Sequence, residues 1–110
     1  MELQKAKAIA EELKALLDPV CQRVIIAGSI RRQKPYPNDI ELLAIPKYYC
    51  GVDMLDRRVG ELISQGALGF RLNKLGRRVY GPKNKLMLHI PSSIGVDIFS
   101  TDLGCWPVAL

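Results

Sequence analysis

Residues 20–46 read VCQRVIIAGSIRRQKPYPNDIELLAIP, two apolar runs joined by a polar segment that contains two prolines. The first run, residues 20–27, includes consecutive β-branched residues and is typical of a buried strand. Gly28 and Ser29 interrupt it, residues 30–33 permit one helical turn, and the prolines require a loop. Residues 39–46 then predict a second strand. The stretch therefore predicts two strands joined by a Gly-Ser corner.

Helical periodicity flanks this stretch on both sides. In residues 2–17 the apolar positions form one stripe, with lysines and glutamates on the opposite side. This pattern predicts an amphipathic helix, which ends at Asp18 because the following proline disfavours helical backbone there. Residues 52–63 show the same spacing and predict a second helix that ends by Gly66.

The last third of the chain is divided by glycines into strand-like pieces around residues 70–72, 85–90 and 96–100. The order of helix, strand, helix and several strands predicts an α+β fold, with a mixed β-sheet of about four to five strands and two main helices on one face. A domain usually has about 100–200 residues, so we expect residues 1–110 to form one domain, either complete or a piece of a longer chain.

The composition excludes several classes of protein. Hydrophobic residues make up 48% of the chain, which is too many for a disordered tail, and no apolar stretch reaches the roughly 20 residues of a membrane span. The three cysteines include no C-x-x-C pair and fit neither a disulfide framework nor a zinc site. The N-terminus has no signal-peptide core. We expect a soluble, cytoplasmic protein without a membrane partner.

Positive charge is concentrated in two segments that contain no acidic residue. Residues 19–38 carry four basic residues, and residues 71–85 carry six. Such segments suit an anionic partner, either a nucleotide or a nucleic acid, and they suit an ordinary basic surface equally well. Within the second segment, Arg77, Arg78 and Lys83 are the candidate nucleic-acid contacts.

Three carboxylates are the candidate metal ligands. Asp39 and Glu41 are two residues apart on a predicted strand, so both project from the same face. Asp97 stands inside an apolar strand, where aspartate is rare unless it is paired or binds a ligand. If the two strands are neighbours, the three carboxylates can hold two Mg²⁺ ions roughly 3.5–4 Å apart, as in phosphoryl transfer.

The Gly28-Ser29 corner is the candidate phosphate site. Glycine lets the backbone approach a ligand closely, and amides that open a helical turn point toward an anion. Ser29 adds a hydroxyl donor, and Arg31 or Arg32 adds a guanidinium suited to phosphate. We therefore expect a phosphate site that faces the carboxylates.

These motifs resemble a known family. GSIRR at residues 28–32, NDIELL at 38–43 and VDIF at 96–99 are similar to the nucleotidyltransferase superfamily. Within it, the most similar domain is the palm of the family X, DNA polymerase β-like enzymes, over residues 20–100. The resemblance implies Mg²⁺ as cofactor, for which Mn²⁺ can substitute, and an NTP or dNTP as substrate. It also implies transfer of a nucleotidyl group to the 3′-hydroxyl of a polynucleotide such as DNA.

The resemblance further implies a role for each residue. Asp39 and Glu41 would bridge both metal ions, and the family usually has aspartate at the position of Glu41. Asp97 would bind only the catalytic ion and accept the proton of the attacking hydroxyl. The Gly28-Ser29 pair would hold the triphosphate, and Arg32 would neutralise its developing charge.

Two other classes of function remain open. A module with the same fold can bind nucleotide or DNA with little or no turnover, and an antitoxin-like protein can use the fold to contact a protein partner. Metal-dependent nucleotide binding distinguishes the first two classes from the third. Primer extension distinguishes the enzyme from the binding module.

Overall fold

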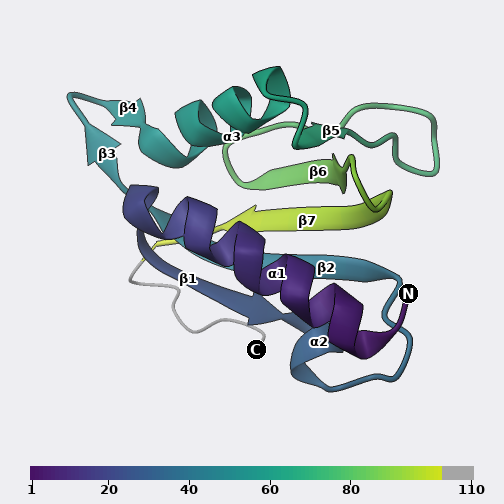
Figure 1. Cartoon of the computed structure of the whole chain (residues 1–110). Helices are drawn as coiled ribbons and strands as arrows, with labels where there is room; N and C mark the ends of the chain where they lie inside the picture. The colour runs from purple at the N-terminus through teal and green to yellow at the C-terminus, as the bar shows by residue number, and fades with distance from the viewer. Residues whose placement is uncertain (103–110) are drawn as a thin grey trace.

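A computed structural model describes residues 1–102 and shows a five-stranded sheet with two main helices (Figure 1). The strands of this sheet are β1 (Cys21–Ala27), β2 (Asp39–Pro46), β5 (Leu68–Phe70), β6 (Asn84–His89) and β7 (Ile94–Ser100). Their spatial order is β1-β2-β7-β6-β5. The pair β2 and β7 is parallel, and all other neighbours are antiparallel. The predicted α+β class with a mixed sheet is confirmed.

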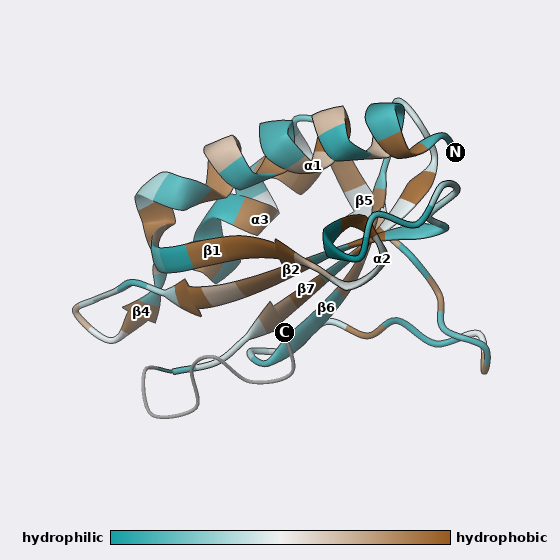
Figure 2. Cartoon of the chain, turned by 90° about the horizontal axis from the view of Figure 1, so that it is seen from below, coloured by the Kyte–Doolittle hydropathy of each residue, from teal (hydrophilic) through white to brown (hydrophobic). Residues whose placement is uncertain are grey.

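The helices α1 (Leu3–Leu17) and α3 (Met54–Ser64) lie on the same side of the sheet (Figure 2). α1 ends where the 3₁₀ turn η1 (Asp18–Val20) begins, as the proline predicts. α3 begins after Asp53, whose carboxylate accepts a hydrogen bond of 3.0 Å from the Asp56 amide and so caps the helix. In the part of the chain that the structure describes, no helix combines the length and apolarity needed to cross a bilayer.

Apolar side chains of both helices and of one sheet face form the core. Ile40 and Leu42 of β2, together with Val96 and Ile98 of β7, belong to it and are at most 1% exposed. Side chains alternate between the two faces of a strand. The residues between these positions therefore project from the opposite, open face of the sheet.

Two local elements differ from the expectation. Residues 52–53 are predicted to begin the second helix, but β3 (Tyr48–Tyr49) and β4 (Val52–Asp53) form a small antiparallel hairpin outside the main sheet, and the helix begins at Met54. The strand predicted at 70–72 lies at Leu68–Phe70 instead, because Leu68 packs into the core and is only 2% exposed. Arg71 consequently lies just beyond the strand.

One lysine of the second basic segment belongs to the interior. Lys85 in β6 is 0% exposed. Its Nζ donates to the Gly81 carbonyl at 2.8 Å, lies 3.4 Å from the Asp56 carboxylate and stands 5.0 Å from the centre of the Tyr80 ring. A buried ammonium requires partners of this kind. Lys85 therefore links β6 to α3 and is not part of the basic surface.

The cysteines within residues 1–102 are free thiols. Cys21 is buried and Cys50 is exposed. Burial raises the pKa of the Cys21 thiol to about 11, so this thiol stays protonated at neutral pH. The third cysteine, Cys105, lies outside the described residues.

The core beneath the open face can be tested with Leu42→Ala. Leu42 is 0% exposed, so the variant should lose about 2–5 kcal/mol of unfolding free energy in urea denaturation, from lost transfer energy and the cavity left behind. The control is Leu75→Ala at a position that is 78% exposed, where the change should stay within about 0.5 kcal/mol. Equal losses in the two variants would contradict the described packing of β2.

Candidate functional site

The three predicted carboxylates lie on one face of the sheet, on neighbouring strands. The parallel register pairs Glu41 with Asp97 and Asp39 with Gly95. Paired residues of adjacent strands project from the same face at a strand spacing of about 4.8 Å. The predicted meeting of Asp97 with the Asp39 and Glu41 pair is therefore confirmed. Their role as metal ligands stays a prediction.

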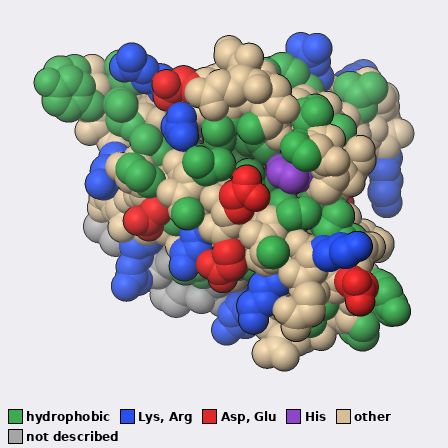
Figure 3. Space-filling view, in the orientation of Figure 1, with side chains coloured by type: hydrophobic (Ala, Val, Ile, Leu, Met, Phe, Trp, Pro, Cys, Tyr) green, Lys and Arg blue, Asp and Glu red, His purple; other side chains and the backbone are tan. Residues whose placement is uncertain are grey.

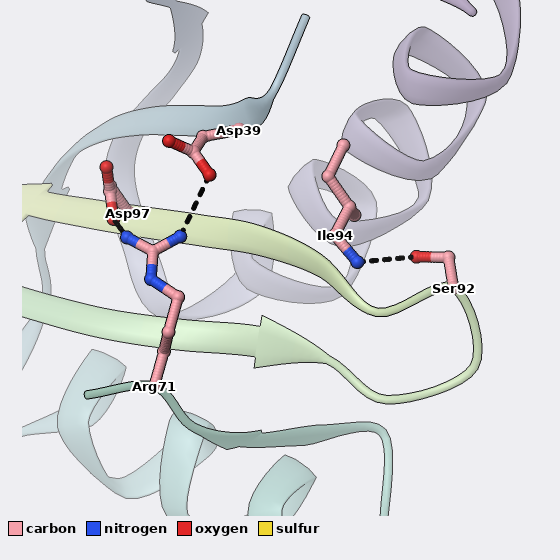
Figure 4. A network of polar contacts seen from close by, with 5 residues as sticks. All are labelled: Asp39, Arg71, Ser92, Ile94 and Asp97. Atoms are coloured by element: carbon pink, nitrogen blue, oxygen red, sulfur yellow. Dashed lines mark hydrogen bonds and ion pairs between the residues drawn. The ribbon is translucent and has the colours of Figure 1, made fainter. Parts of the chain in front are cut away.

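A guanidinium joins two of these carboxylates. Arg71 follows β5, and its Nη1 donates to Asp39 Oδ1 at 3.0 Å while its Nη2 donates to Asp97 Oδ1 (Figure 4). Both contacts are charge-assisted hydrogen bonds, which are stronger than neutral ones. One positive charge thus offsets the repulsion between two acids on adjacent strands. From the sequence alone, Arg71 is one member of a basic segment, and no pattern there assigns it to the site.

Gly95 provides the space for this guanidinium. A Cβ atom at this position would overlap with Nη1 of Arg71 and with Oδ1 of Asp39. The backbone of Gly95 does not have a positive φ, so the constraint at this position is the space taken by the two side-chain ends and not backbone conformation. A glycine inside a strand often marks the close approach of another group. That glycine is the sequence signal from which a partner of the acids could have been inferred.

Glu41 is turned toward the Gly-Ser corner. The short helix α2 (Gly28–Arg31) forms this corner and begins two residues before the predicted turn. Gly28 has a φ of 66°, and a Cβ on it would overlap with the Glu41 carboxylate. Backbone conformation and space therefore both require glycine at this position. The structure brings the predicted phosphate corner next to the third acid.

The remaining residues of the corner are more accessible. Ser29 is half-buried, and the Arg31 and Arg32 side chains are exposed. The Arg32 amide donates to the Gly28 carbonyl at 3.0 Å and closes α2. The guanidinium of Arg32 is thus accessible at the corner where the sequence predicts a phosphate.

The predicted nucleic-acid contacts Arg77, Arg78 and Lys83 are exposed in the segment between β5 and β6. The Arg78 guanidinium lies 4.3 Å from the centre of the Phe70 ring. Lys83 lies at the far end of the segment, where its carbonyl accepts a hydrogen bond from the Ser100 amide. On the face seen in Figure 3, basic and acidic side chains are interspersed. The three residues are accessible, and nucleic-acid binding by them stays a prediction.

The carboxylates can be compared with the needs of a divalent cation. Within residues 1–102, no three His, Cys, Asp or Glu side chains are placed to hold a metal ion. Arg71 lies between Asp39 and Asp97, and Glu41 is turned to Gly28. The donor chemistry nevertheless fits Mg²⁺ or Mn²⁺, because all three groups are carboxylates on one face. The position of the Arg71 guanidinium also shows that a positive charge fits between the Asp39 and Asp97 carboxylates.

Burial perturbs one of these acids. It raises the pKa of the Asp97 carboxyl above its ordinary value of 3.8, and the nearby charges of Asp39 and Glu41 raise it further. The Arg71 charge and hydrogen bond act in the opposite direction, but the net shift is upward. The ionised form of Asp97 is therefore disfavoured in the folded protein relative to water.

Comparison with known proteins assigns no family to this geometry: no family model and no curated protein matches the chain. The functional interpretation therefore depends on the arrangement of the residues.

The raised pKa of Asp97 predicts a dependence of stability on pH. As pH rises through 3.8, the unfolded chain releases this proton before the folded protein does. Stability therefore falls until the folded pKa is passed, and the loss persists at neutral pH. In EDTA, Asp97→Asn should be more stable than wild type at about pH 7, and the gain should vanish at about pH 3. Urea denaturation at both values measures this. Destabilisation at neutral pH would show that the Arg71 contact outweighs burial.

The fit between Gly95 and Arg71 can be tested with a double-mutant cycle. Gly95→Ala should cost about 1–3 kcal/mol of unfolding free energy in the wild type, because its methyl group overlaps with the guanidinium. The same substitution should cost less in an Arg71→Ala background, where the Asp39 side chain can turn away. Penalties that add to within about 0.5 kcal/mol would contradict the contact.

Proposed function

We propose that this chain is the palm-like catalytic domain of a metal-dependent nucleotidyltransferase that resembles the family X DNA polymerases. It would transfer a nucleotidyl group from an NTP or dNTP to a hydroxyl, the 3′-hydroxyl of a polynucleotide such as DNA. The observation that supports this most is the in-register pairing of Glu41 with Asp97, with Asp39 on the same face. The Gly28 corner lies beside Glu41, which supports a phosphate position next to the carboxylates.

In this proposal the residues of the chain share binding, charge neutralisation and proton transfer. Gly28 and Ser29 bind the triphosphate, and the exposed Arg32 neutralises the charge that develops on the departing pyrophosphate. The hydroxyl oxygen forms a bond to the α-phosphorus while the bond from that phosphorus to pyrophosphate breaks. Asp97 accepts the hydroxyl proton.

The carboxylates have a second role in the proposal. Asp39, Glu41 and Asp97 would hold two Mg²⁺ ions, which supply charge neutralisation at the reacting phosphate when bound. Mn²⁺ has a similar preference for carboxylate oxygen and can substitute.

The polynucleotide partner would be held by Arg77, Arg78 and Lys83. Contacts of arginine and lysine with phosphates add affinity without sequence preference. All three side chains are exposed on one connecting segment. Because nucleoside triphosphates are intracellular metabolites, we place the reaction in the cytoplasm.

A nucleotide- or DNA-binding module with little or no turnover is the second candidate, and Arg71 favours it. In the structure an internal cation already satisfies Asp39 and Asp97. Glu41 is one methylene longer than the aspartate usual in the family, and a displacement of about 1 Å can cost roughly a hundredfold in rate. Such a domain can bind nucleotide and still react slowly.

Calorimetric titration with Mn²⁺ and a non-hydrolysable dNTP tests the site. Wild type should bind the nucleotide only with metal present, and Asp39→Ala should weaken binding at least about tenfold because one carboxylate ligand is lost. Glu61→Ala, which removes an exposed acid from α3, is the matched control and should bind like wild type. Nucleotide binding that does not depend on metal, or no nucleotide binding at all, would reject the site and favour the protein-interaction class.

Extension of a primed DNA template then separates the enzyme from the module. Wild type should add nucleotides in Mg²⁺, and Asp97→Asn should slow extension by about 10²–10⁴-fold, the usual contribution of a general base. Primer extension assays on both proteins measure this. Metal-dependent nucleotide binding without any extension would instead identify the binding module.

A further inference from the structure

Arg71 is the internal counter-ion of the carboxylate face. Its guanidinium donates to the Asp39 carboxylate of β2 on one side and to the Asp97 carboxylate of β7 on the other (Figure 4). Its side chain is 24% exposed, so the contact is partly shielded from water. Gly95 leaves the space that this side chain fills. β2, β7 and the segment after β5 thus together form one binding position for a positive charge.

We propose that Arg71 makes metal loading conditional on an anion. A divalent cation would bind Asp39 and Asp97 only by displacing the guanidinium, and a triphosphate that arrives with the cation would accept the displaced guanidinium. This inference rests on the proposed function and concerns the regulation of the same site. The favoured ligand is then the metal–triphosphate complex, and the free cation binds weakly.

The displacement follows from the shared carboxylates. Oδ1 of Asp39 and Oδ1 of Asp97 are the atoms that accept hydrogen bonds from Arg71. A Mg²⁺ ion contacts its ligand oxygens at about 2.0–2.1 Å. A guanidinium on the same two carboxylates would lie within a few ångströms of that ion, where like charges repel strongly in a partly buried site. Metal binding therefore costs the two charge-assisted hydrogen bonds of Arg71.

The anion offsets this cost. A displaced guanidinium is well suited to phosphate oxygens, which match its planar donors. A nucleoside triphosphate supplies such oxygens next to the ion that it carries. Metal and nucleotide should accordingly bind with positive cooperativity, and part of that coupling should disappear when Arg71 is removed.

Mn²⁺ binding to the intact chain, followed by electron paramagnetic resonance without nucleotide, tests the proposal. Arg71→Gln should bind Mn²⁺ at least about fivefold more tightly than wild type, because no internal cation has to leave. Arg71→Lys should lie between the two, since a single ammonium cannot bridge both carboxylates as a guanidinium does. A non-hydrolysable dNTP should increase the Mn²⁺ affinity of wild type more than that of Arg71→Gln.

Lys74→Gln is the matched control. Lys74 is exposed in the same connecting segment as Arg71, so the variant removes one positive charge without touching the carboxylates. Its Mn²⁺ affinity should stay within about twofold of wild type, because exposed charges are screened by salt. Urea denaturation in EDTA checks the folding of each variant, and Arg71→Lys carries the comparison if Arg71→Gln does not fold.

The outcomes separate this inference from the proposed function. The role of Arg71 is overturned if Arg71→Gln binds Mn²⁺ no more tightly than wild type does. If Asp39→Ala still loses the Mn²⁺ binding that wild type shows, the proposed nucleotidyltransferase site is retained. Failure of wild type to bind Mn²⁺ even in the presence of the dNTP rejects both. Tighter binding by Arg71→Gln, together with a smaller effect of the dNTP, supports the competition.

Discussion

The parallel pairing of β2 with β7 is the constraint on which the candidate site depends. On one face of this pair, Ile40 and Val96 are completely buried. A slip of β7 by one residue against β2 would move Val96 out of the core and drive Asp97 into it. Burial of unpaired carboxylates is very costly. The hydrophobic face of the sheet therefore determines the position of the acids on the other face.

Two glycines adapt the backbone to these acids in different ways. Gly28 has a left-handed backbone and lies against the Glu41 carboxylate, so both conformation and space exclude a side chain there. Gly95 has ordinary strand backbone, and a Cβ there would overlap with the side-chain ends of Arg71 and Asp39. The same residue type thus meets a turn requirement in one place and a packing requirement in the other. Both positions are in contact with the carboxylate face.

Sequence patterns predicted the structure correctly where a single side-chain periodicity or a single residue type determined it. The bounds of β2 and the side of the sheet that carries Asp97 followed from alternation and from an acid within an apolar strand. The partner of Asp97 did not follow, because Arg71 reaches it across β6 and nothing in a basic segment distinguishes one arginine from the next. Lys85 is a similar case, since its burial depends on Asp56 and Tyr80, which become its neighbours only after folding. The hairpin of β3 and β4 was missed because strands of two residues have no detectable period.

The chain order of the central strands also affects how the protein is made. β2 leaves the ribosome early, whereas β7, the last strand that the structure describes, inserts between β2 and β6. Until that insertion, one edge of β2 exposes unpaired backbone groups, which are prone to join strands of other chains. A chain in which β7 has not yet inserted thus exposes a strand edge that can pair with another chain.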